Sequence, residues 1–344
     1  MVLNIKNVGK LKSANVEFNG ITVIAGENDT GKSTVGKMLF CIFNSLYKIE
    51  ERIDKERALL LKNEISDNEI LTAMMKKIME HEFNMQINNF DFPEKTSEIE
   101  FKINDSEAKI KVENNANIFI SNNINLDTES IYIDDPYVLD INSPNYFTLR
   151  GHRGQLRFCL NKDRDISVTE VIDELITTKR LAEILEKLNS VCPGEMIRKD
   201  NSEFAYKETG TGKLIDAVNM SAGLKTFAII KTLLLNGSLQ DNGVLILDEP
   251  EIHLHPKWQL IFAELIVLIQ KEFSLRILLN THSPYFLNAI EVYSRKNGIS
   301  NKCKYYLAEA SDDGMSEIFD VSDDIARIYE KLVDPIQDLE DGSY

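Results

Sequence analysis

The residues best suited to chemistry form a loop at positions 26–33, where the chain reads GENDTGKS. This stretch matches the spacing G-x-x-x-x-G-K-[ST] at every fixed position, and an apolar run ending at Ala25 precedes it. Glycines let backbone N–H groups turn toward one point at a helix N-terminus, which creates a nest for phosphate oxygens. Lys32 is expected to reach the β- and γ-phosphates of ATP, and Ser33 to join the shell of a Mg²⁺ ion. The residues expected to contact the nucleotide are Gly26, Glu27, Asn28, Asp29, Thr30, Gly31, Lys32, Ser33 and Thr34.

Two apolar stretches that read as strands end in side chains suited to phosphoryl transfer. The first, VLILDEPE at 244–251, ends in adjacent carboxylates. We expect Asp248 to hold the Mg²⁺ through water and Glu249 to polarise the attacking water. The second, RILLNTHS at 276–283, places His282 at the carboxyl end of a strand, where parallel sheets bind ligands. His282 is therefore a candidate sensor of the γ-phosphate. The candidate catalytic residues are Lys32, Glu249 and His282.

The stretch NMSAGLK at 219–225 places a serine and a glycine at the start of an apolar helix. It offers a second anion-binding helix terminus, distant in sequence from the loop. One chain does not need two such cradles for one nucleotide, whereas two chains placed head to tail do. We therefore expect Ser221, with Gly223, to cap the γ-phosphate held by Lys32 of a second copy. The alternative is that Ser221 is an ordinary helix N-cap.

Three weaker patterns have simpler explanations. GTGK at 210–213 is followed by leucine and not by Ser or Thr, so a hairpin turn explains it better. A metal site at His253, His255 and Glu251 is the less favoured alternative to structural or interface roles. The basic stretch LRGHRGQLRF at 149–158 is expected to form a solvated face or internal salt bridges. A groove for DNA is the sharper alternative there.

The expected elements would place these residues on one α/β scaffold. Residues 2–24 read as strands separated by turns, and a helix is expected from Lys32 to about Tyr47. From 203 onward strands alternate with helices, which implies a largely parallel sheet with crossover connections. The C-terminal stretch from Ser322 has an apolar stripe and is expected to begin a helix with that serine as its N-cap.

The region between these parts has a different character. Residues 46–202 combine charged helices with a β-hairpin and show no sustained heptad repeat. The predicted organisation is a discontinuous ATPase core, 1–45 and 203–344, with 46–202 inserted as a helical and β lid-like subdomain.

Composition limits the function classes. The formal net charge of the 344 residues is −16, which argues against a broad nucleic-acid surface although a local basic groove stays compatible with it. The four cysteines have no CxxC spacing and read as reduced thiols. The most apolar run, LIFAELIVLI at 260–269, is interrupted by Glu264 and is too short for a membrane span. We expect a cytoplasmic protein with no membrane association.

The motifs, taken in order, resemble the ABC-type P-loop ATPases: the loop at 26–33, S-x-G at 221–223, DEPE followed by IHLHP, and THS at 281–283. The opening LNIKNVGKLKSANVEFNGITVIAGENDTGKST is similar to the OLD, RecF and SMC-like branch more than to transporters. The resemblance covers roughly 1–45 and 203–295. It implies an α/β ABC-type ATPase head with a mostly parallel core sheet, an antiparallel N-terminal β-subdomain and a largely helical insertion. It also implies a homodimer of ATP-sandwiched heads that hydrolysis to ADP and phosphate separates.

Departures from that pattern narrow the expectation. MSAGLK stands where transporters have LSGGQ, and long coiled-coil arms are absent. About 60 residues follow His282, too few for the Toprim nuclease that OLD proteins carry after the ATPase. The chain therefore resembles the AAA-family ATPases of bacterial anti-phage systems, in which a nuclease or toxin is a separate chain.

Two functions follow as expectations. The first is an ATP-driven dimeric switch that senses a cue and controls a separate protein effector. The alternative is a RecF-like DNA-maintenance ATPase, for which DNA would be the partner. The acidic balance favours the first, and a basic stripe contributed by 149–164 would favour the second.

Overall fold

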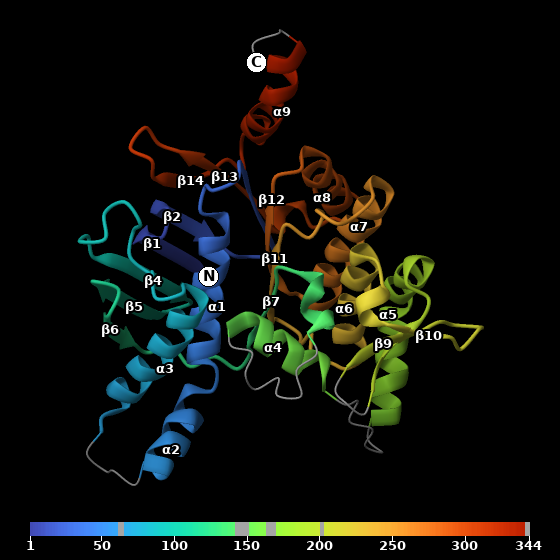
Figure 1. Ribbon diagram of the computed structural model, residues 1–344, viewed down its shortest axis with the longest axis horizontal. Coiled ribbons are helices and arrows are strands. Elements are labelled where there is room, and N and C mark those ends of the chain that lie inside the picture. Colours follow the sequence, from blue (N-terminus) through green and yellow to red (C-terminus); the bar gives the residue numbers. More distant parts are fainter. Residues whose placement is uncertain (61–64, 142–150, 163–169, 200–202, 341–344) are drawn as a thin grey trace. The chain divides into compact units, whose positions relative to one another are not determined.

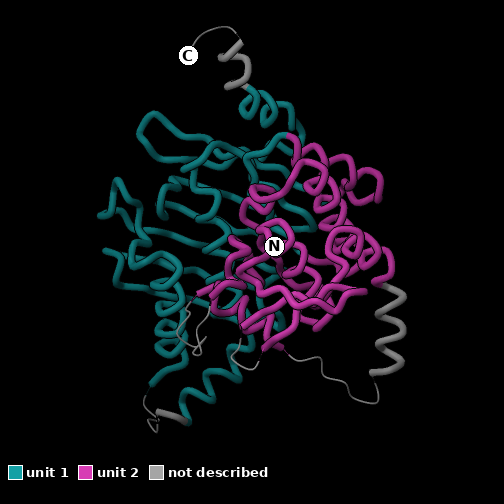
Figure 2. Tube along the Cα trace, turned by 45° about the vertical axis from the view of Figure 1, so that its right-hand side comes forward, with its two compact units in different colours: residues 1–130, 276–284, 302–344 teal, residues 131–275, 285–301 magenta. Residues whose placement is uncertain are grey.

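The structure is a computed structural model that describes residues 1–60, 65–141, 151–162, 170–199 and 203–340. The chain forms two compact units, which Figure 2 distinguishes by colour. Unit 1 comprises Met1–Ser130, Arg276–Pro284 and Lys302–Tyr344, and unit 2 comprises Ile131–Leu275 and Tyr285–Asn301.

Unit 1 is built on a sheet that joins antiparallel and parallel pairs (Figure 1). Its antiparallel part follows the order β6–β5–β4–β1–β2. Strand β14 then pairs parallel to β2 and antiparallel to β13, while β3 lies between β13 and β12 and is parallel to both. The strands are β1 (Val2–Val8), β2 (Leu11–Glu17), β3 (Ile21–Gly26), β4 (Ser97–Ile103), β5 (Ser106–Glu113), β6 (Asn117–Asn122), β12 (Arg276–Thr281), β13 (Cys303–Ala310) and β14 (Ser316–Asp320).

Burial explains why the two parts of this sheet have different sequences. In β4 the buried residues Ser97, Ile99 and Phe101 alternate with polar ones, as expected for a strand with one solvated face. All six residues of β3 are buried, which is the pattern of a parallel strand covered on both faces. The phosphate loop therefore leaves the sheet from its most apolar strand.

The described helices of unit 1 follow the apolar periodicity of the sequence. α1 (Lys32–Leu46) buries Val35, Leu39 and Ile42 along one face, and α3 (Asp67–Glu82) packs against it. Ser66 and Glu69 cap α3 reciprocally, which satisfies two backbone N–H groups at its start. The remaining helices of this unit are α2 (Ile49–Leu60) and α9 (Ala326–Glu340).

Unit 2 contains β7 (Ser130–Ile133) beside β11 (Val244–Asp248), and a separate antiparallel sheet of β8, β9 and β10. Its core includes the rings of Phe227, Phe262 and Phe286, with centroids 5.4 Å apart for the first pair and 6.4 Å for the second. The other elements are η1 (Pro136–Asp140), α4 (Gly151–Leu160), α5 (Glu170–Val191), β8 (Glu195–Arg198), β9 (Phe204–Lys207), β10 (Leu214–Asp216), η3 (Ala217–Asn219), α6 (Ala222–Leu235), α7 (Pro256–Phe273), α8 (Pro284–Lys296) and η4 (Ser300–Lys302).

The predicted α/β fold class is confirmed, and one local expectation is corrected. The described part of the stretch 149–158 lies in helix α4, an element that the sequence analysis does not predict. Ser322 does not cap the C-terminal helix, which begins at Ala326; its hydroxyl accepts a hydrogen bond from the Tyr305 N–H at 3.0 Å instead. The GTGK stretch lies between β9 and β10, as expected for a hairpin, and Gly210 and Gly212 both adopt positive φ there.

The compact units and the predicted core and insertion divide the chain on different grounds. Residues 46–130 belong to unit 1, and residues 131–202 belong to unit 2 together with the α6 and β11 segments. The division into an ATPase core and an insertion stays a prediction. Among the described residues, no helix combines the length and apolar character needed to cross a membrane. The four cysteines are buried, and no disulfide joins any two of them.

Candidate active site

The phosphate loop of unit 1 is shaped by two glycines, at each of which a larger residue would be strained. Gly26 has φ 154°, and a Cβ there would lie 2.4 Å from the carbonyl oxygen of Ala308. Gly31 has the left-handed φ of 76°, and a Cβ would lie 2.7 Å from the Leu11 side chain. The chain therefore leaves β3 and enters α1 by a path that requires glycine at both ends of the loop.

Lys32 occupies the centre of this loop. Its side chain is buried, and its Nζ donates to the carbonyl oxygens of Gly26 at 3.0 Å and of Glu27 at 2.6 Å. The Thr30 hydroxyl also donates to the Glu27 carbonyl, at 2.8 Å. These bonds hold the backbone curled around one ammonium group, and a phosphate entering the nest would offer that group a charged acceptor.

The start of α1 fits an anion. No side chain caps this terminus, and no acidic residue lies in its first turn. Its N–H groups and partial positive charge therefore face no built-in negative partner. Ser33 and Thr34 follow Lys32 in this first turn and are half-buried, whereas Glu27, Asn28 and Asp29 are exposed along the loop.

The exposed acids of the loop contact two other parts of unit 1. Asp29 lies 3.1 Å from Lys10 Nζ, and Glu27 lies 2.8 Å from Lys331 Nζ of α9. Both ion pairs are largely exposed, so they steady the loop weakly.

His282 follows the strand that neighbours β3. Thr281, at the end of β12, pairs in register with Ala25, so His282 leaves the sheet at the same edge as Gly26. The backbone N–H of Ser283 donates to the Thr281 hydroxyl at 3.0 Å, which turns the chain after His282. The structure therefore brings the phosphate loop and His282 to one edge of the unit 1 sheet.

In unit 2, Asp248 and Glu249 lie at the end of β11. The Tyr132 hydroxyl on the neighbouring strand β7 donates to Asp248 Oδ2 at 2.7 Å. Glu249 adopts the left-handed φ of 50°, which is uncommon for a residue with a Cβ. Both carboxylates border a cavity of about 30 Å³, room for about one water molecule.

A second group of charges lies behind Tyr132. Its ring stacks on His152 with centroids 4.5 Å apart, and His152 Nε2 lies 3.0 Å from Asp134 Oδ2. Arg153 binds the same oxygen at 2.8 Å. Burial opposes the ionisation of Asp134, but His152 and Arg153 outweigh it and lower its pKa to about 2. The favoured expectation of internal salt bridges for this basic stretch is therefore confirmed for Arg153, whereas Arg150 lies outside the described residues.

Ser221 is the N-cap of α6. Its hydroxyl accepts a long hydrogen bond of 3.4 Å from the Leu224 N–H, and the residue is exposed. Gly223 is buried, and a Cβ there would lie only 3.0 Å from the His253 carbonyl oxygen and 3.1 Å from the Trp258 ring, so this close packing favours glycine. The ordinary capping role is therefore present, and it leaves the helix terminus facing solvent within unit 2.

A partly buried ion pair fixes the first turn of α6. Lys225 is 1% exposed, and its Nζ lies 2.6 Å from Asp140 Oδ2 and 4.9 Å from the centre of the Tyr137 ring. The Tyr137 ring in turn meets His253 edge-on, with centroids 5.5 Å apart. Turn η1, the start of α6 and the segment after Glu249 therefore interlock.

The predicted site residues divide between the two units. Unit 1 holds the phosphate loop and His282, and unit 2 holds Asp248, Glu249, Ser221 and Gly223. Sequence reasoning missed Tyr132, Lys225 and Asp140. The sequence contains two hints of these residues, an aromatic residue in the strand SIYI and a lysine inside an apolar helix. Neither hint indicates which residue the side chain contacts.

The residues fit a nucleotide with Mg²⁺ better than a protein-only metal centre. Among the described residues, no group of three or more His, Cys, Asp or Glu side chains is arranged to hold a metal ion. Mg²⁺ uses few protein ligands because waters and substrate phosphates complete its shell, so a single hydroxyl such as that of Ser33, or a single carboxylate such as that of Asp248, is a suitable type of donor. His255 instead caps α7, accepting from the Lys257 N–H at 3.3 Å, which is a structural role.

Comparison with known proteins agrees with this class of site. Residues 21–288 match the family described as "AAA domain, putative AbiEii toxin, Type IV TA system". The match covers more than half of the chain and includes the phosphate loop, α6, β11 and His282. The fold and the site thus define a P-loop ATPase of the α/β class. The chain belongs to this AAA-domain family.

One curated relative is the "Retron Vc95 probable ATPase" of Vibrio cholerae serotype O1 biovar El Tor, 31% identical over 90 residues. That match covers 23% of this chain and 17% of the relative, so it spans only a small part of that protein.

Solved structures show the same fold at low identity. An Smc head bound to the C-terminal winged-helix domain of ScpA has a TM-score of 0.56 and 16% identity, covering 95% of this chain and 98% of that one. An Smc head with an extended coiled coil, bound to the C-terminal domain of ScpA derived from Pyrococcus furiosus, has a TM-score of 0.50 and 14% identity, covering 98% of each. The fold is therefore similar to that of SMC ATPase heads.

Proposed function

We propose that this protein binds ATP with Mg²⁺, closes as a homodimer around two nucleotides, hydrolyses them to ADP and phosphate, and thereby controls a separate protein effector. The setting is bacterial anti-phage defence in the cytoplasm. The observation that carries the proposal is the phosphate loop, in which an uncapped helix start and a buried lysine form one anion nest.

The phosphate loop and the end of β11 would divide the chemistry between them. Backbone N–H groups of Gly26–Ser33 and the Lys32 ammonium would bind the β- and γ-phosphates. Bound Mg²⁺ would neutralise developing charge on the phosphates, with Ser33 and Asp248 as its protein donors. Glu249 would orient and deprotonate the attacking water, and His282 would contact the γ-phosphate.

The exposed start of α6 supports a composite site. Ser221 lies at a helix N-terminus with no acidic residue in the first turn, so it offers N–H groups and a hydroxyl to an anion. Because Ser221 is exposed, a second copy of the chain could bring its nucleotide there. Gly223 and the Lys225–Asp140 pair would hold this terminus in place.

The proposal that this protein controls a separate effector rests on the proteins to which the chain is similar. The matching family description names a toxin–antitoxin system, and the partial relative is a retron ATPase. The DNA-maintenance alternative has less support, because Arg153 is paired with Asp134 and Arg157 is buried. Arg157 is therefore closed to a DNA backbone, and Arg153 would have to give up its ion pair to reach one.

Complementation between two inactive variants tests the composite site. Lys32→Ala removes the lysine, and Ser221→Arg blocks the second cradle. In a mixture, a heterodimer pairs the intact Lys32 of one chain with the intact Ser221 of the other, so partial ATPase activity should return. Light scattering with ATP would verify that the two variants associate. Associated variants that stay inactive would contradict the composite site.

The ATPase rate with and without linear duplex DNA separates the two functions, with Glu249→Gln as the blank. We expect a rate that ignores DNA. Strong stimulation by DNA would favour the maintenance ATPase instead.

Glu249→Gln should bind ATP and accumulate as a closed dimer, and wild-type turnover in that variant would refute the assignment of the base.

A further inference from the structure

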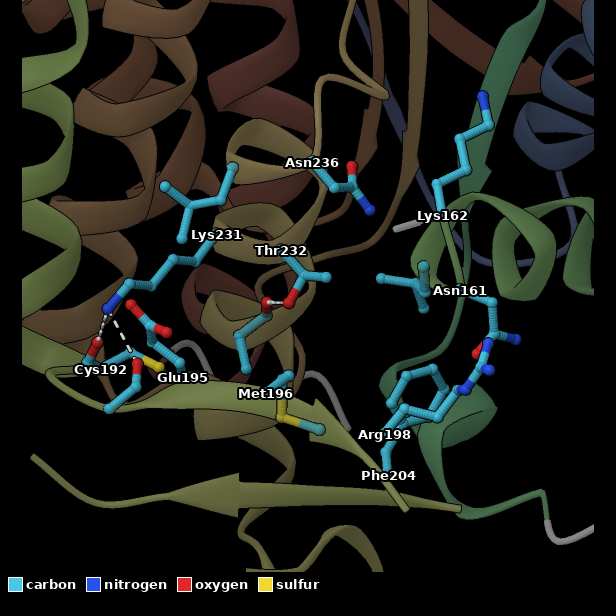
Figure 3. A pocket seen from close by; sticks show the side chains of 14 residues that line it. Asn161, Lys162, Cys192, Glu195, Met196, Arg198, Phe204, Lys231, Thr232 and Asn236 are labelled. Carbon is cyan, nitrogen blue, oxygen red and sulfur yellow. Dashed lines mark hydrogen bonds between the residues drawn. The ribbon is translucent and has the colours of Figure 1, made fainter. Parts of the chain in front are cut away.

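A second pocket lies within unit 2, separate in sequence from the phosphate loop (Figure 3). Its volume is about 200 Å³, and its walls come from the end of α4, strands β8 and β9, and the C-terminal half of α6. The nucleotide roles proposed above use none of its lining residues.

The pocket contains an amide that the protein leaves unused. Both the Oδ1 and the Nδ2 of Asn161 are buried from solvent and have no hydrogen-bond partner among the described residues. Leaving a buried amide unpaired is costly, so such a group in a native structure calls for an explanation. A ligand with a donor and an acceptor on one edge would satisfy both atoms.

The other polar groups of the pocket fall into two classes. Thr232 donates to the Ala228 carbonyl, and the Asn236 amide donates to the Cys159 carbonyl, so the fold uses both. Arg198 and Lys162 are exposed and form no ion pair within the described part of the chain. In Figure 3, Asn161 and Arg198 lie toward the right of the view and Lys231 toward the left.

The charge of the pocket is opposite to that of the chain. Lys162, Arg198 and Lys231 line it, against the single carboxylate of Glu195, in a protein whose net charge is −16. Lys231 is 5% exposed. Its Nζ donates hydrogen bonds to the carbonyls of Cys192 at 2.9 Å and Gly194 at 2.8 Å, and to the Asn189 amide oxygen. It therefore contributes its charge to the pocket, and a bound anion would be attracted by it.

We propose that this pocket binds a small organic anion whose carboxylate or phosphate group pairs with Arg198 and whose polar edge pairs with Asn161. The volume is below the range of about 300–1,000 Å³ usual for drug-sized ligands, so the occupant is smaller than a whole nucleotide. Because the pocket is built against α6, and Ser221 caps that helix, the anion would act on the element that carries the proposed composite site.

The test is isothermal titration of the full chain with four anions and a neutral control. Orthophosphate and ribose 5-phosphate probe for a phosphate group, acetate and succinate probe for a carboxylate, and ribose is the neutral control. The Lys32→Ala background weakens anion binding at the phosphate loop, and the pocket substitutions assign the remaining binding, so a failure of the nucleotide proposal would not affect the result. We expect at least one anion, and not ribose, to bind with one site per chain at concentrations up to roughly 20 mM.

Three substitutions in that background locate the site. Arg198→Gln should weaken the binding at least about tenfold, because it removes a charge-assisted hydrogen bond. Lys213→Gln makes the same change of charge at an exposed position outside the pocket and should leave binding unchanged. Asn161→Leu removes the unpaired amide, so it should abolish binding while raising the Tm of the ligand-free chain by roughly 2 °C or more.

Two outcomes would overturn the proposal. If none of the four anions binds, the pocket holds water alone. If an anion binds to the Arg198→Gln and Asn161→Leu variants with the same affinity as to the Lys32→Ala chain from which they are made, it binds elsewhere on the chain.

Discussion

The phosphate loop of unit 1 and the start of α6 in unit 2 are both proposed to hold phosphate, but different contacts position them. The loop is fixed by its own backbone: two glycines, and a lysine that binds the carbonyls of Gly26 and Glu27. The α6 terminus is fixed by side chains distant in sequence, above all by Lys225 and Asp140, 85 residues apart.

This difference separates what a sequence can reveal from what it cannot. A loop that positions itself carries its geometry in consecutive residue types, so a spacing rule finds it. A helix terminus positioned by a carboxylate distant in sequence depends on a contact that consecutive residues do not reveal. The predictions below test whether the two regions fail in correspondingly different ways.

The largest effect is expected at the loop. Lys32→Ala removes the ammonium at the centre of the nest and should lower kcat/KM for ATP about 10³-fold. Stability should change less than activity because the fold around the loop is held by backbone and glycine contacts. Steady-state kinetics and urea unfolding would measure the two. Lys37→Ala, on the same helix, is the matched control, and an equal loss there would refute a specific role for Lys32.

The opposite pattern is expected at α6. Asp140→Ala leaves the buried Lys225 charge without its carboxylate and should reduce the free energy of unfolding by about 3 kcal/mol. Lys225→Met combined with Asp140→Ala should recover much of that loss, because the unpaired charge is gone. Urea unfolding of the two single variants and the double variant measures the coupling. Additive losses would show that the pair does not hold this helix start.

The sequence predicted the loop region almost completely. Helix α1 was expected from Lys32 to about Tyr47 and ends at Leu46, and the strand before the loop is fully buried as its apolar run indicated. These features depend on apolar periodicity and on the short-range needs of glycine, which consecutive residues display.

The remainder depends on tertiary contacts that no local pattern names. Helix α4 was missed because its segment contains Gly151, Gly154 and several basic residues, which favour a loop when read alone. In the structure His152 and Arg153 bind Asp134, and Arg157 is buried against the Val138 carbonyl. Ser322 was misplaced for a similar reason, since its hydroxyl serves a strand and not the following helix.

The salt bridges of α4 predict a pH dependence. The pKa of Asp134 is about 2 in the folded chain, against 3.8 for an ordinary aspartate. A depressed pKa adds stability at pH values above 3.8, and that contribution is lost as the pH falls toward 2. It amounts to about 2 kcal/mol at neutral pH.

Asp134→Asn should therefore be less stable than wild type at pH 7 by about 2 kcal/mol, with the difference shrinking as the pH falls from about 4 to about 2. Urea unfolding across this pH range would measure it. Asp105→Asn, at an exposed turn of unit 1, is the control. A difference between wild type and Asp134→Asn that stays constant with pH would exclude the ion pairs as its cause.

The smallest effect is expected at Asp248, whose backbone is positioned by its own strand and whose carboxylate is positioned by a residue distant in sequence. Asp248 ends a locally predictable strand, but its carboxylate accepts from Tyr132, 116 residues away. Tyr132→Phe removes only that hydroxyl, so Asp248 should keep its place in the strand and lose one bond that orients it. Because a hydrogen bond to a charged group contributes about 1.5–3 kcal/mol, kcat should fall about tenfold or slightly more. ATP affinity, which depends on the phosphate loop, should change by less than about twofold.

Stopped-flow hydrolysis with equilibrium ATP binding separates these quantities, and Tyr293→Phe is the matched control. A change in affinity without a change in kcat would assign Tyr132 to nucleotide binding and remove the contrast between the two regions.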